Sequence, residues 1–457
     1  MHEELANAPG HVFPAQMPFC LELTGPLDST LLKTALASLI CRHDALRTTL
    51  VPNQAIPQIE RKARLNVFAS CGLGAPGLYY QAVLGEPGSF SLPIEDVTRA
   101  GRLGQKVEEL LLEDLSRPFD YARPPLLRAR LLRIDACKHL LVLVVSTLVC
   151  DLWSLRILHL DLAKFYDEAS NPNLPRTPGR VLQFHRFVLW QYQQAREGQF
   201  EADVEFWRQQ WVRFESAQIW YRDIPFAQRQ RHSGTPGIER LFLDSAQSRR
   251  IRRFADNTQF GMRSTVLAAF AAWLARVTDK QMIALNMMCL NRSLPEHENT
   301  VGWFSNTHLI GLEIPTGTTS AKLIARAHAA LLDAEAHQAI PPAFLWNRLG
   351  GIPKQGDASI FFTFISSIGL PPVCTQDGVS FLPRPIPDIP GLQSPVGLSF
   401  VALDSEEGLL LTVNYSLDRF RPADIQEMLR SLKETLNWMS EHPQEPYSQA
   451  ATEGVHD

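Results

Sequence analysis

Apolar residues recur along this chain of 457 residues with two different periods. Alternating or continuous apolar runs predict strands at His11 to Leu23, Leu126 to Ile134 and Leu140 to Val145. Apolar residues three and four positions apart predict helices at Leu31 to Arg42, which Asp28 or Ser29 can cap, and at Leu155 to Tyr166. The same patterns predict further helices and strands at Val107 to Leu115, Ser264 to Val277, Met282 to Leu290, Val301 to Ile314, Ser359 to Ser366, Leu409 to Tyr415 and Pro422 to Met439. This mixed order predicts an α/β protein with mixed (α+β) sheets.

A stretch rich in Pro and Asn divides the chain at residues 171–180. Such residues favour turns and end helices, so the stretch is typical of a linker. A chain of 457 residues also exceeds the size of one ordinary core. We therefore expect an N-terminal lobe of residues 1–170, a linker of residues 171–180 and a C-terminal lobe of residues 181–457.

Composition and charge narrow the class of protein. Hydrophobic residues make up 45% and charged residues 20%, which is typical of a globular protein. The net charge is -4, and basic residues are interspersed with acidic ones, which argues against nucleic acid as a partner. No apolar stretch approaches the roughly 18 residues of a membrane span, and the acidic start of the chain does not resemble a signal peptide. We expect a cytoplasmic protein that makes no contact with a membrane.

The seven cysteines are scattered and lack Cys-x-x-Cys spacing. This pattern indicates free thiols in a reducing compartment, without a disulfide framework or a zinc site. We accordingly expect no metal and no tightly bound cofactor.

The most informative segment follows the apolar run Leu141 to Val145 and reads Ser146-Thr147-Leu148-Val149-Cys150-Asp151-Leu152-Trp153-Ser154. It resembles the active-site segment of the condensation domains of nonribosomal peptide synthetases, which reads His-His-x-x-x-Asp-Gly. Ser146 and Thr147 occupy the positions of the two histidines, and Leu152 occupies the position of the glycine. A threonine hydroxyl can orient an amine or donate a hydrogen bond to an oxyanion, but its pKa does not suit a general base near neutral pH. The alternative is that Ser146 and Thr147 only fill a relic site.

Other blocks resemble the same family in the same order, from Pro18 to Met439. They are Pro18-Phe19 through Arg47-Thr48-Thr49, Pro118-Phe119-Asp120 with Pro125 to Ala129, Asn291-Arg292, and Val301 to Thr307. The resemblance implies two chloramphenicol-acetyltransferase-like lobes in a V with a central tunnel. It also implies that peptidyl or acyl carrier proteins present the substrates on phosphopantetheine arms, and that an acyl thioester is joined to an amine. The family's Gln- and Trp-containing helix before the first strand has no counterpart here, which we interpret as a trimmed or unusual start.

The resemblance also implies roles for individual residues. Asp151 is expected to form a structural pair with Arg292, which occupies the matching position in the opposite lobe, so that the pair holds the loop and closes the two lobes. Trp153, Asn306 and His308 are candidates for the tunnel wall, and His308 is a candidate replacement for the missing base. Cys150 is better explained by packing, because no cation or base lies near it in the sequence, and His159, which falls within a helix, is expected on a packed or solvated face.

Three interpretations of function stay open at this point. In the first, the chain forms an amide bond between carrier-bound acyl and aminoacyl groups. In the second, it is a catalytically silent module that docks carrier proteins or recruits a tailoring enzyme. A minor third interpretation is a heterocyclisation-type variant, because Phe362-Thr363 and the run Ser366 to Gly369 resemble a motif of that branch. The active-site segment of that branch has two aspartates, of which only the second is matched, by Asp151; Ser146 occupies the position of the first.

Overall fold

We analysed a computed structural model of the chain. The structure describes residues 16–52, 66–68, 79–85, 90–99, 103–177, 181–219, 223–227, 236–350, 360–366, 370–384 and 398–446. Residues 11–15 of the first predicted strand, residues 178–180 of the predicted linker and residues 367–369 of the Ser366 to Gly369 run lie outside this part.

Packing divides the described chain into two compact units. The first unit draws on Met1–Glu197, Arg292–Phe304 and Gly369–Leu392, and the second on Gly198–Asn291, Ser305–Ile368 and Gln393–Asp457. Two segments from the later half of the sequence therefore pack with the first unit. The lobe boundaries expected at residues 170 and 181 stay a prediction.

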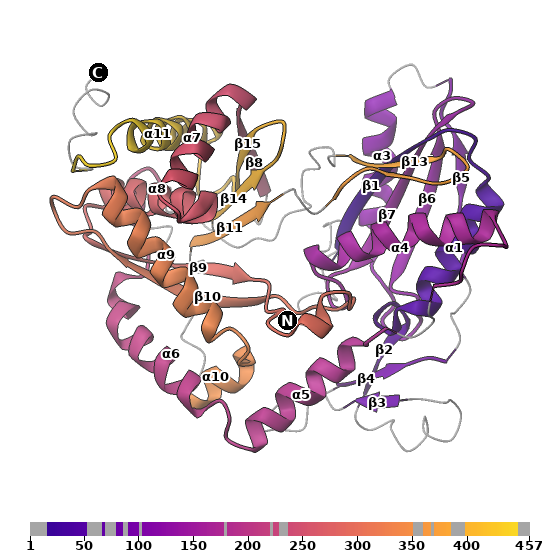
Figure 1. Cartoon of the computed structure of the whole chain (residues 1–457), viewed down its shortest axis with the longest axis horizontal. Helices are drawn as coiled ribbons and strands as arrows, with labels where there is room; N and C mark the ends of the chain where they lie inside the picture. Colours follow the sequence, from indigo (N-terminus) through magenta and orange to yellow (C-terminus); the bar gives the residue numbers. More distant parts are fainter. Residues whose placement is uncertain are drawn as a thin grey trace. The chain divides into compact units, whose positions relative to one another are not determined.

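A mixed sheet with helices on both faces forms the first unit (Figure 1). Its strand order is β12-β13-β1-β7-β6-β5, and a small sheet has the order β2-β4-β3. The strands are β1 (Gln16–Thr24), β2 (Thr48–Pro52), β3 (Asn66–Phe68), β4 (Tyr79–Val83), β5 (Ile94–Asp96), β6 (Leu127–Arg133), β7 (Lys138–Ser146), β12 (Val373–Cys374) and β13 (Ser380–Arg384). The helices are α1 (Ser29–Arg42), α3 (Leu103–Leu115), α4 (Leu152–Ser170) and α5 (Phe184–Arg196), with the 3-10 turns η1 (Asp44–Arg47) and η5 (Pro295–His297).

The apolar run of β7 is explained by burial of both of its faces. Leu141, Leu143 and Val145 pack in one core with residues of α1 and α4. Val142 and Val144 point to the other face, where they pack with α3. Because neighbouring side chains of a strand point to opposite faces, a strand covered on both sides is apolar at every position. The motif segment follows directly after this buried central strand.

Helix α1 shows how closely local sequence sets an element. Asp28 caps the helix, since its Oδ1 accepts hydrogen bonds from the N–H groups of Thr30 (2.7 Å) and Leu31 (3.2 Å). The predicted cap is thus Asp28, one of the two residues proposed. The predicted apolar face, which includes Leu32, Leu36 and other residues at helical spacing, is buried.

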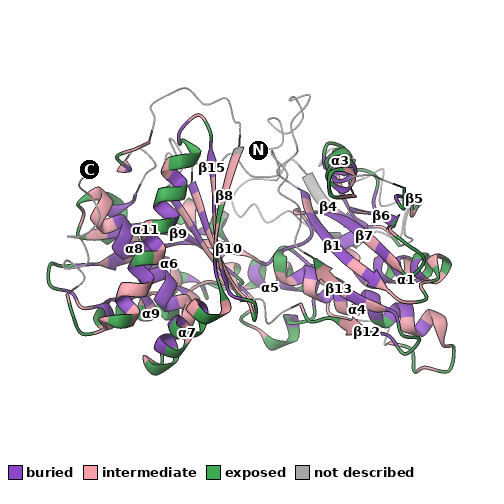
Figure 2. Ribbon diagram, turned by 90° about the horizontal axis from the view of Figure 1, so that it is seen from above, coloured by how far each residue is buried: buried purple, intermediate pink, exposed green. Residues whose placement is uncertain are grey.

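The second unit contains another six-stranded sheet, of order β10-β9-β11-β14-β15-β8. Its strands are β8 (Pro236–Leu243), β9 (Met282–Cys289), β10 (Asn306–Glu313), β11 (Ile360–Ser366), β14 (Leu398–Asp404) and β15 (Leu409–Ser416). Its helices are α6 (Glu201–Phe214), α7 (Ser245–Asn257), α8 (Gly261–Thr278), α9 (Ser320–Ala336), α10 (Pro342–Arg348) and α11 (Pro422–Glu441), with the 3-10 turn η3 (Glu215–Ala217). Strand β11 is parallel to both neighbours and the other pairs are antiparallel, so the sheet is mixed as expected. Buried residues concentrate where helices cover the sheets, and the outer helix faces are exposed (Figure 2).

One predicted strand is shorter in the structure. Val301 to Ile314 was expected to form a single strand, but β10 begins only at Asn306. Val301 and Phe304 are buried within the first unit instead, where the Phe304 ring contacts Phe184 at a centroid distance of 4.9 Å. Their apolar character therefore reflects packing of an irregular segment and not a place in the sheet.

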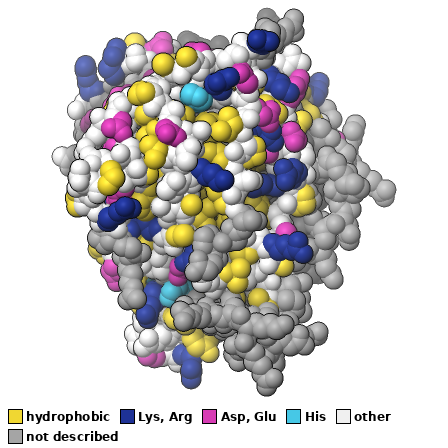
Figure 3. All heavy atoms as spheres, turned by 90° about the vertical axis from the view of Figure 1, so that its right-hand side faces the viewer, with side chains coloured by type: hydrophobic (Ala, Val, Ile, Leu, Met, Phe, Trp, Pro, Cys, Tyr) yellow, Lys and Arg dark blue, Asp and Glu magenta, His cyan; other side chains and the backbone are white. Residues whose placement is uncertain are grey.

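The surface agrees with the mixed charge pattern of the sequence. On the face drawn in Figure 3, basic and acidic side chains are interspersed among apolar ones. Among the helices that the structure describes, none is long and apolar enough to cross a membrane.

Candidate functional site

The motif segment occupies the junction between β7 and α4. Ser146 is the last residue of β7 and is fully buried. Its N–H donates to the carbonyl of Leu126 (3.0 Å), and its hydroxyl oxygen accepts from the N–H of Leu148 (3.3 Å). The Ser146 side chain thus stabilises the turn that follows the strand, which is a structural task.

Thr147 differs from its neighbour. It is only partly buried, and its hydroxyl makes no hydrogen bond with the residues that the structure describes. Leu148 and Val149, which follow it, line a small pocket within the first unit together with side chains from η1, β2, β4 and α5, namely Asp44, Ala45, Thr48, Gln81, Val83, Phe184 and His185. Of the two residues at the histidine positions, Thr147 alone keeps a hydroxyl that a ligand could contact.

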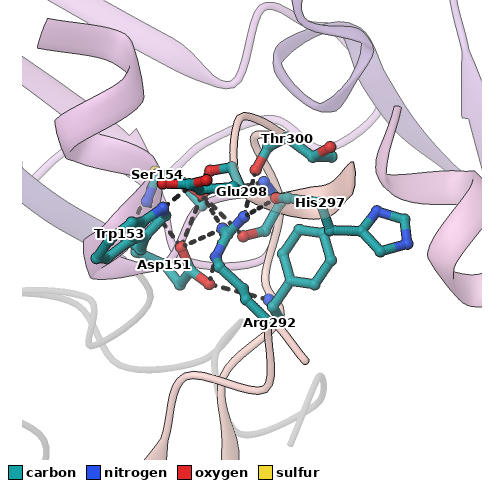
Figure 4. Close-up of polar contacts among 10 residues, drawn as sticks. Asp151, Trp153, Ser154, Arg292, His297, Glu298 and Thr300 are labelled. Carbon is teal, nitrogen blue, oxygen red and sulfur yellow. Dashed lines mark hydrogen bonds and ion pairs between the residues drawn. The ribbon is translucent and has the colours of Figure 1, made fainter. Parts of the chain in front are cut away.

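Asp151 caps helix α4 and is the centre of a buried polar network (Figure 4). Only 1% of Asp151 is exposed. Its Oδ1 accepts hydrogen bonds from the N–H (2.8 Å) and the hydroxyl (2.7 Å) of Ser154, and its Oδ2 accepts from the N–H of Phe304 (3.1 Å). The same carboxylate that begins the helix therefore fixes the segment Arg292–Phe304 against it.

Arg292 supplies the positive charge of this network. Its Nη2 lies 3.0 Å and 3.2 Å from the two carboxylate oxygens of Asp151, and its Nη1 donates to the carbonyls of His297 (2.8 Å) and Thr300 (2.7 Å). The guanidinium lies over the ring of Phe304, 4.0 Å from its centroid. Burial lowers the pKa of Arg292, and the negative charge of Asp151 opposes this effect. Asp151 and Arg292 form the expected buried ion pair, but both residues belong to the first unit, whereas the sequence interpretation placed Arg292 in the opposite lobe.

Trp153 and Gly302 complete the contact between the motif and this segment. The indole N–H of Trp153 donates to the carbonyl of Glu298 (2.9 Å), as drawn in Figure 4. The N–H of Gly302 donates to the hydroxyl oxygen of Ser154 (3.1 Å). A Cβ atom at Gly302 would lie 2.3 Å from the ring of Phe184, so the segment approaches α5 too closely for any side chain at this position. We call Asp151, Trp153, Ser154, Arg292 and the backbone of residues 297–304 the Asp151 network.

Asn306 and His308 lie in the second unit, at the start of β10. The Asn306 amide donates to the carbonyls of Gln338 and Ile340, both at 2.9 Å. The His308 ring stacks on Trp207 at 4.4 Å, and its Nε2 lies 3.4 Å from the Gln338 carbonyl. Both residues fix the chain that follows α9.

The surroundings of His308 weaken its candidacy as a replacement base. The residue is 3% exposed, and burial lowers its pKa to about 4. A general base works best when its pKa is near the working pH, so an imidazole of this kind removes protons poorly at neutral pH.

Cys150 and His159 are buried structural residues, in agreement with the sequence interpretation. Burial raises the pKa of the Cys150 thiol well above its ordinary value, and the charge of Asp151 adds to this, so the reactive thiolate is disfavoured. His159 is fully buried, with Nε2 2.9 Å from the Pro371 carbonyl and its ring edge-to-face with Phe19. Within the described ranges, no group of three or more His, Cys, Asp or Glu side chains could hold a metal ion.

Several members of the Asp151 network were not anticipated from the sequence. Ser154 stands three residues after Asp151, which is the spacing of a helix cap and could have indicated its role. The carbonyls of His297 and Thr300 and the N–H of Phe304 are backbone groups, which no residue type reveals. Phe362 is a fully buried core residue of β11, so its place in the resemblance to the heterocyclisation branch coincides with a packing role.

Comparison with known proteins identifies the family. The model of the condensation domain matches residues 75–453, and the chain belongs to this family. Among curated relatives, surfactin synthase subunit 1 of Bacillus subtilis (strain 168) is 25% identical over 445 residues, which are 95% of this chain and 11% of the relative. Enniatin synthase of Fusarium equiseti is 24% identical over 425 residues, which are 90% of this chain and 12% of the relative. The chain thus spans about a tenth of the length of these two relatives.

Solved structures share the fold. The SgcC5 protein from Streptomyces globisporus superposes with a TM-score of 0.77 at 20% identity, covering 96% of each chain. The first condensation domain of the calcium-dependent antibiotic synthetase gives 0.77 at 19% identity over 99% of this chain and 96% of the other. The X-domain from teicoplanin biosynthesis gives 0.77 at 19% identity over 97% and 94%. The expected family and fold class are therefore confirmed.

Proposed function

We propose that this chain is a condensation-type module of a nonribosomal peptide assembly line, which binds acyl and aminoacyl thioesters on carrier-protein phosphopantetheine arms and joins them through an amide. Membership of the condensation family supports the reaction class. The observation that carries the proposal is the Asp151 network together with the partly buried Thr147, whose hydroxyl makes no hydrogen bond with the described residues. The turn that presents the reacting position is held in place although the histidines are replaced.

The chemistry available to such a site is positioning without proton removal. A free α-amine has a pKa near 8, so roughly a tenth of it is already an uncharged nucleophile at pH 7. Holding an amine and a thioester in the correct geometry can contribute several kcal/mol, whereas a missing general base costs about 10²–10⁴-fold in rate. Thr147 would orient the amine or donate a hydrogen bond to the developing oxyanion. An alcohol acceptor needs a base as it attacks, so the proposal is restricted to amine acceptors.

A second function is favoured by a specific observation. The Ser146 hydroxyl already accepts a hydrogen bond from the N–H of Leu148, and a threonine hydroxyl such as that of Thr147 cannot act as a base. Burial lowers the pKa of His308 to about 4, so His308 is a poor base at neutral pH as well. These features support a catalytically silent module that docks carrier proteins or recruits a tailoring enzyme. One structure that shares the fold with a TM-score of 0.75 is the X-domain in complex with OxyB from teicoplanin biosynthesis.

The two functions are separated by restoring the base. Donor and acceptor carrier domains would be loaded and the product followed by mass spectrometry, with the native chain, Thr147→His and Thr147→Ala. Ser146 is fully buried, so the single Thr147→His exchange disturbs packing less than restoration of both histidines.

Product from the native chain that falls in Thr147→Ala supports the positioning function. If only the Thr147→His variant forms product, the native chain is a silent module whose site lacks the base but can otherwise catalyse the reaction. If neither variant nor the native chain forms product or binds a loaded carrier, the proposal is wrong for both functions. The thermal unfolding midpoint of each variant is the control for folding.

A further inference from the structure

Three arginines on the outer face of helix α7 form no ion pair with the residues that the structure describes. Arg249, Arg250 and Arg253 are exposed, and within the described chain they form no hydrogen bond or salt bridge. With Ala246 and Gln247 they line a shallow groove. We call these three side chains the α7 arginine patch.

The rest of α7 is fixed to the second unit. Ser248, Ile251, Phe254 and Ala255 form its buried face. The fourth arginine, Arg252, binds Asp404 with its Nε at 2.9 Å and its Nη2 at 2.5 Å from Oδ1. Helix α7 thus packs on the second unit through its buried residues, and its other face is exposed (Figures 1 and 2).

The arrangement is costly to the isolated helix. Arg249 and Arg253 are four residues apart, and Arg250 and Arg253 three, so like charges are neighbours on one face. Like charges at these spacings repel each other and destabilise a helix. The carboxylate of Asp244, the cap of α7, interacts with one of these charges: its pKa is lowered first by the hydrogen bond from the backbone N–H of Gln247 and further by the charges of Lys433 and Arg250. Negative charge from outside the chain would remove this repulsion.

Other exposed arginines of the same unit provide a contrast. Arg208, Arg213 and Arg348 are each about half exposed, and each pairs with a glutamate at 2.5–2.7 Å. The chain carries a net charge of -4, and its charges are interspersed elsewhere, including the face in Figure 3. This cluster of arginines, which are unpaired within the described part of the chain, is thus a local feature, too small for a polyanion such as nucleic acid.

We infer that the α7 arginine patch is a docking surface for an acidic helix face of a carrier domain of the same assembly line. The inference rests on the proposed function, which requires carrier domains as partners. The Cα atoms of the three arginines span about 6 Å of helix axis, which matches the spacing of carboxylate residues three or four positions apart on a facing helix. Arginine binds carboxylates through two parallel hydrogen bonds and is enriched at protein interfaces, so a protein carboxylate face is the complementary chemistry.

The test compares two triple variants of equal charge. Arg249→Gln/Arg250→Gln/Arg253→Gln removes the patch, and Arg208→Gln/Arg213→Gln/Arg348→Gln removes three paired arginines from α6 and α10 of the same unit. The dissociation constant for phosphopantetheinylated carrier domains of the same assembly line would be measured by calorimetry at about 50 and 300 mM salt, where screening differs. We expect the patch variant to bind about 10-fold more weakly or worse at low salt, and the control within about 2-fold of the native chain.

Charge reversal makes the test specific. Arg250→Glu should weaken binding, and a carrier domain with a lysine in place of the facing acidic residue should restore it. Equal affinity of the native chain and the patch variant would overturn the assignment of this surface and leave the proposed function standing. If the native chain binds no carrier domain, the proposed function fails and the inference fails with it. Thermal unfolding of the patch variant should be unchanged or slightly raised, because the repulsion within α7 is removed.

Discussion

The Asp151–Arg292 pair offers the sharpest test of how the motif is held. In Asp151→Ala, the cap of α4 is lost, which costs about 1 kcal/mol. Arg292, whose side chain is 6% exposed, is left as a buried charge without its counterion, and breaking such a pair costs about 3–5 kcal/mol. Arg292 keeps its bonds to the carbonyls of His297 and Thr300, so we place the total loss of unfolding free energy at about 3–5 kcal/mol.

Urea unfolding at pH 7 would measure this loss, with a probe in each unit because the two units need not unfold together. The double variant Asp151→Ala/Arg292→Leu removes both charges and should be less destabilised than the sum of the single changes, by about 1–3 kcal/mol. The exposed pair Arg208–Glu205 is the matched control, and Arg208→Gln should cost less than about 1 kcal/mol. A loss below about 1 kcal/mol for Asp151→Ala would refute the view that the pair fixes the junction.

Three further measurements test the site and its surroundings. Any amide formation should rise about tenfold per pH unit below about pH 8, following the acceptor amine, and ester formation from a hydroxyl acceptor at a similar rate would contradict the absence of a base. Burial lowers the pKa of His308 to about 4 in the folded state, so the neutral side chain contributes up to about 3 kcal/mol to the free energy of unfolding above pH 6.5, and this contribution is lost as the pH falls toward 4. The variant His308→Gln should therefore flatten the pH dependence of the urea midpoint between pH 6.5 and 4. An unaltered slope would exclude the effect. A thiol-alkylating reagent followed by mass spectrometry should modify the exposed Cys41, Cys137 and Cys374 in the native chain and leave Cys150 intact until unfolding, whereas rapid labelling of Cys150 would show an open motif turn.

Much of this architecture is predictable because local patterns and tertiary packing agree. The apolar run of β7 and the cap of α1 at Asp28 are set by burial and by backbone hydrogen bonds that neighbouring residues supply. Val301 to Phe304 could not be placed, because apolar residues look alike whether they pack in a strand or in an irregular segment. The contact between Asp151 and Arg292 was expected from the family pattern alone, since no local property of the sequence brings together residues 141 positions apart. The carbonyls that Arg292 binds could not be predicted from the sequence, because every residue has a backbone carbonyl.

The route of the chain through the first unit has a consequence for protein engineering. Strand β1 pairs on one side with β13, and the carboxylate of Asp151 pairs with Arg292, yet both partners come from the later half of the sequence. A fragment that ends at Glu197 would leave β1 with an open edge, which invites aggregation, and would bury Asp151 without its guanidinium. Transplanting this unit into another protein therefore requires the distant segments Arg292–Phe304 and Gly369–Leu392 to be transferred with it. Swap boundaries drawn at a single point in the gene would cut through one cooperative structure.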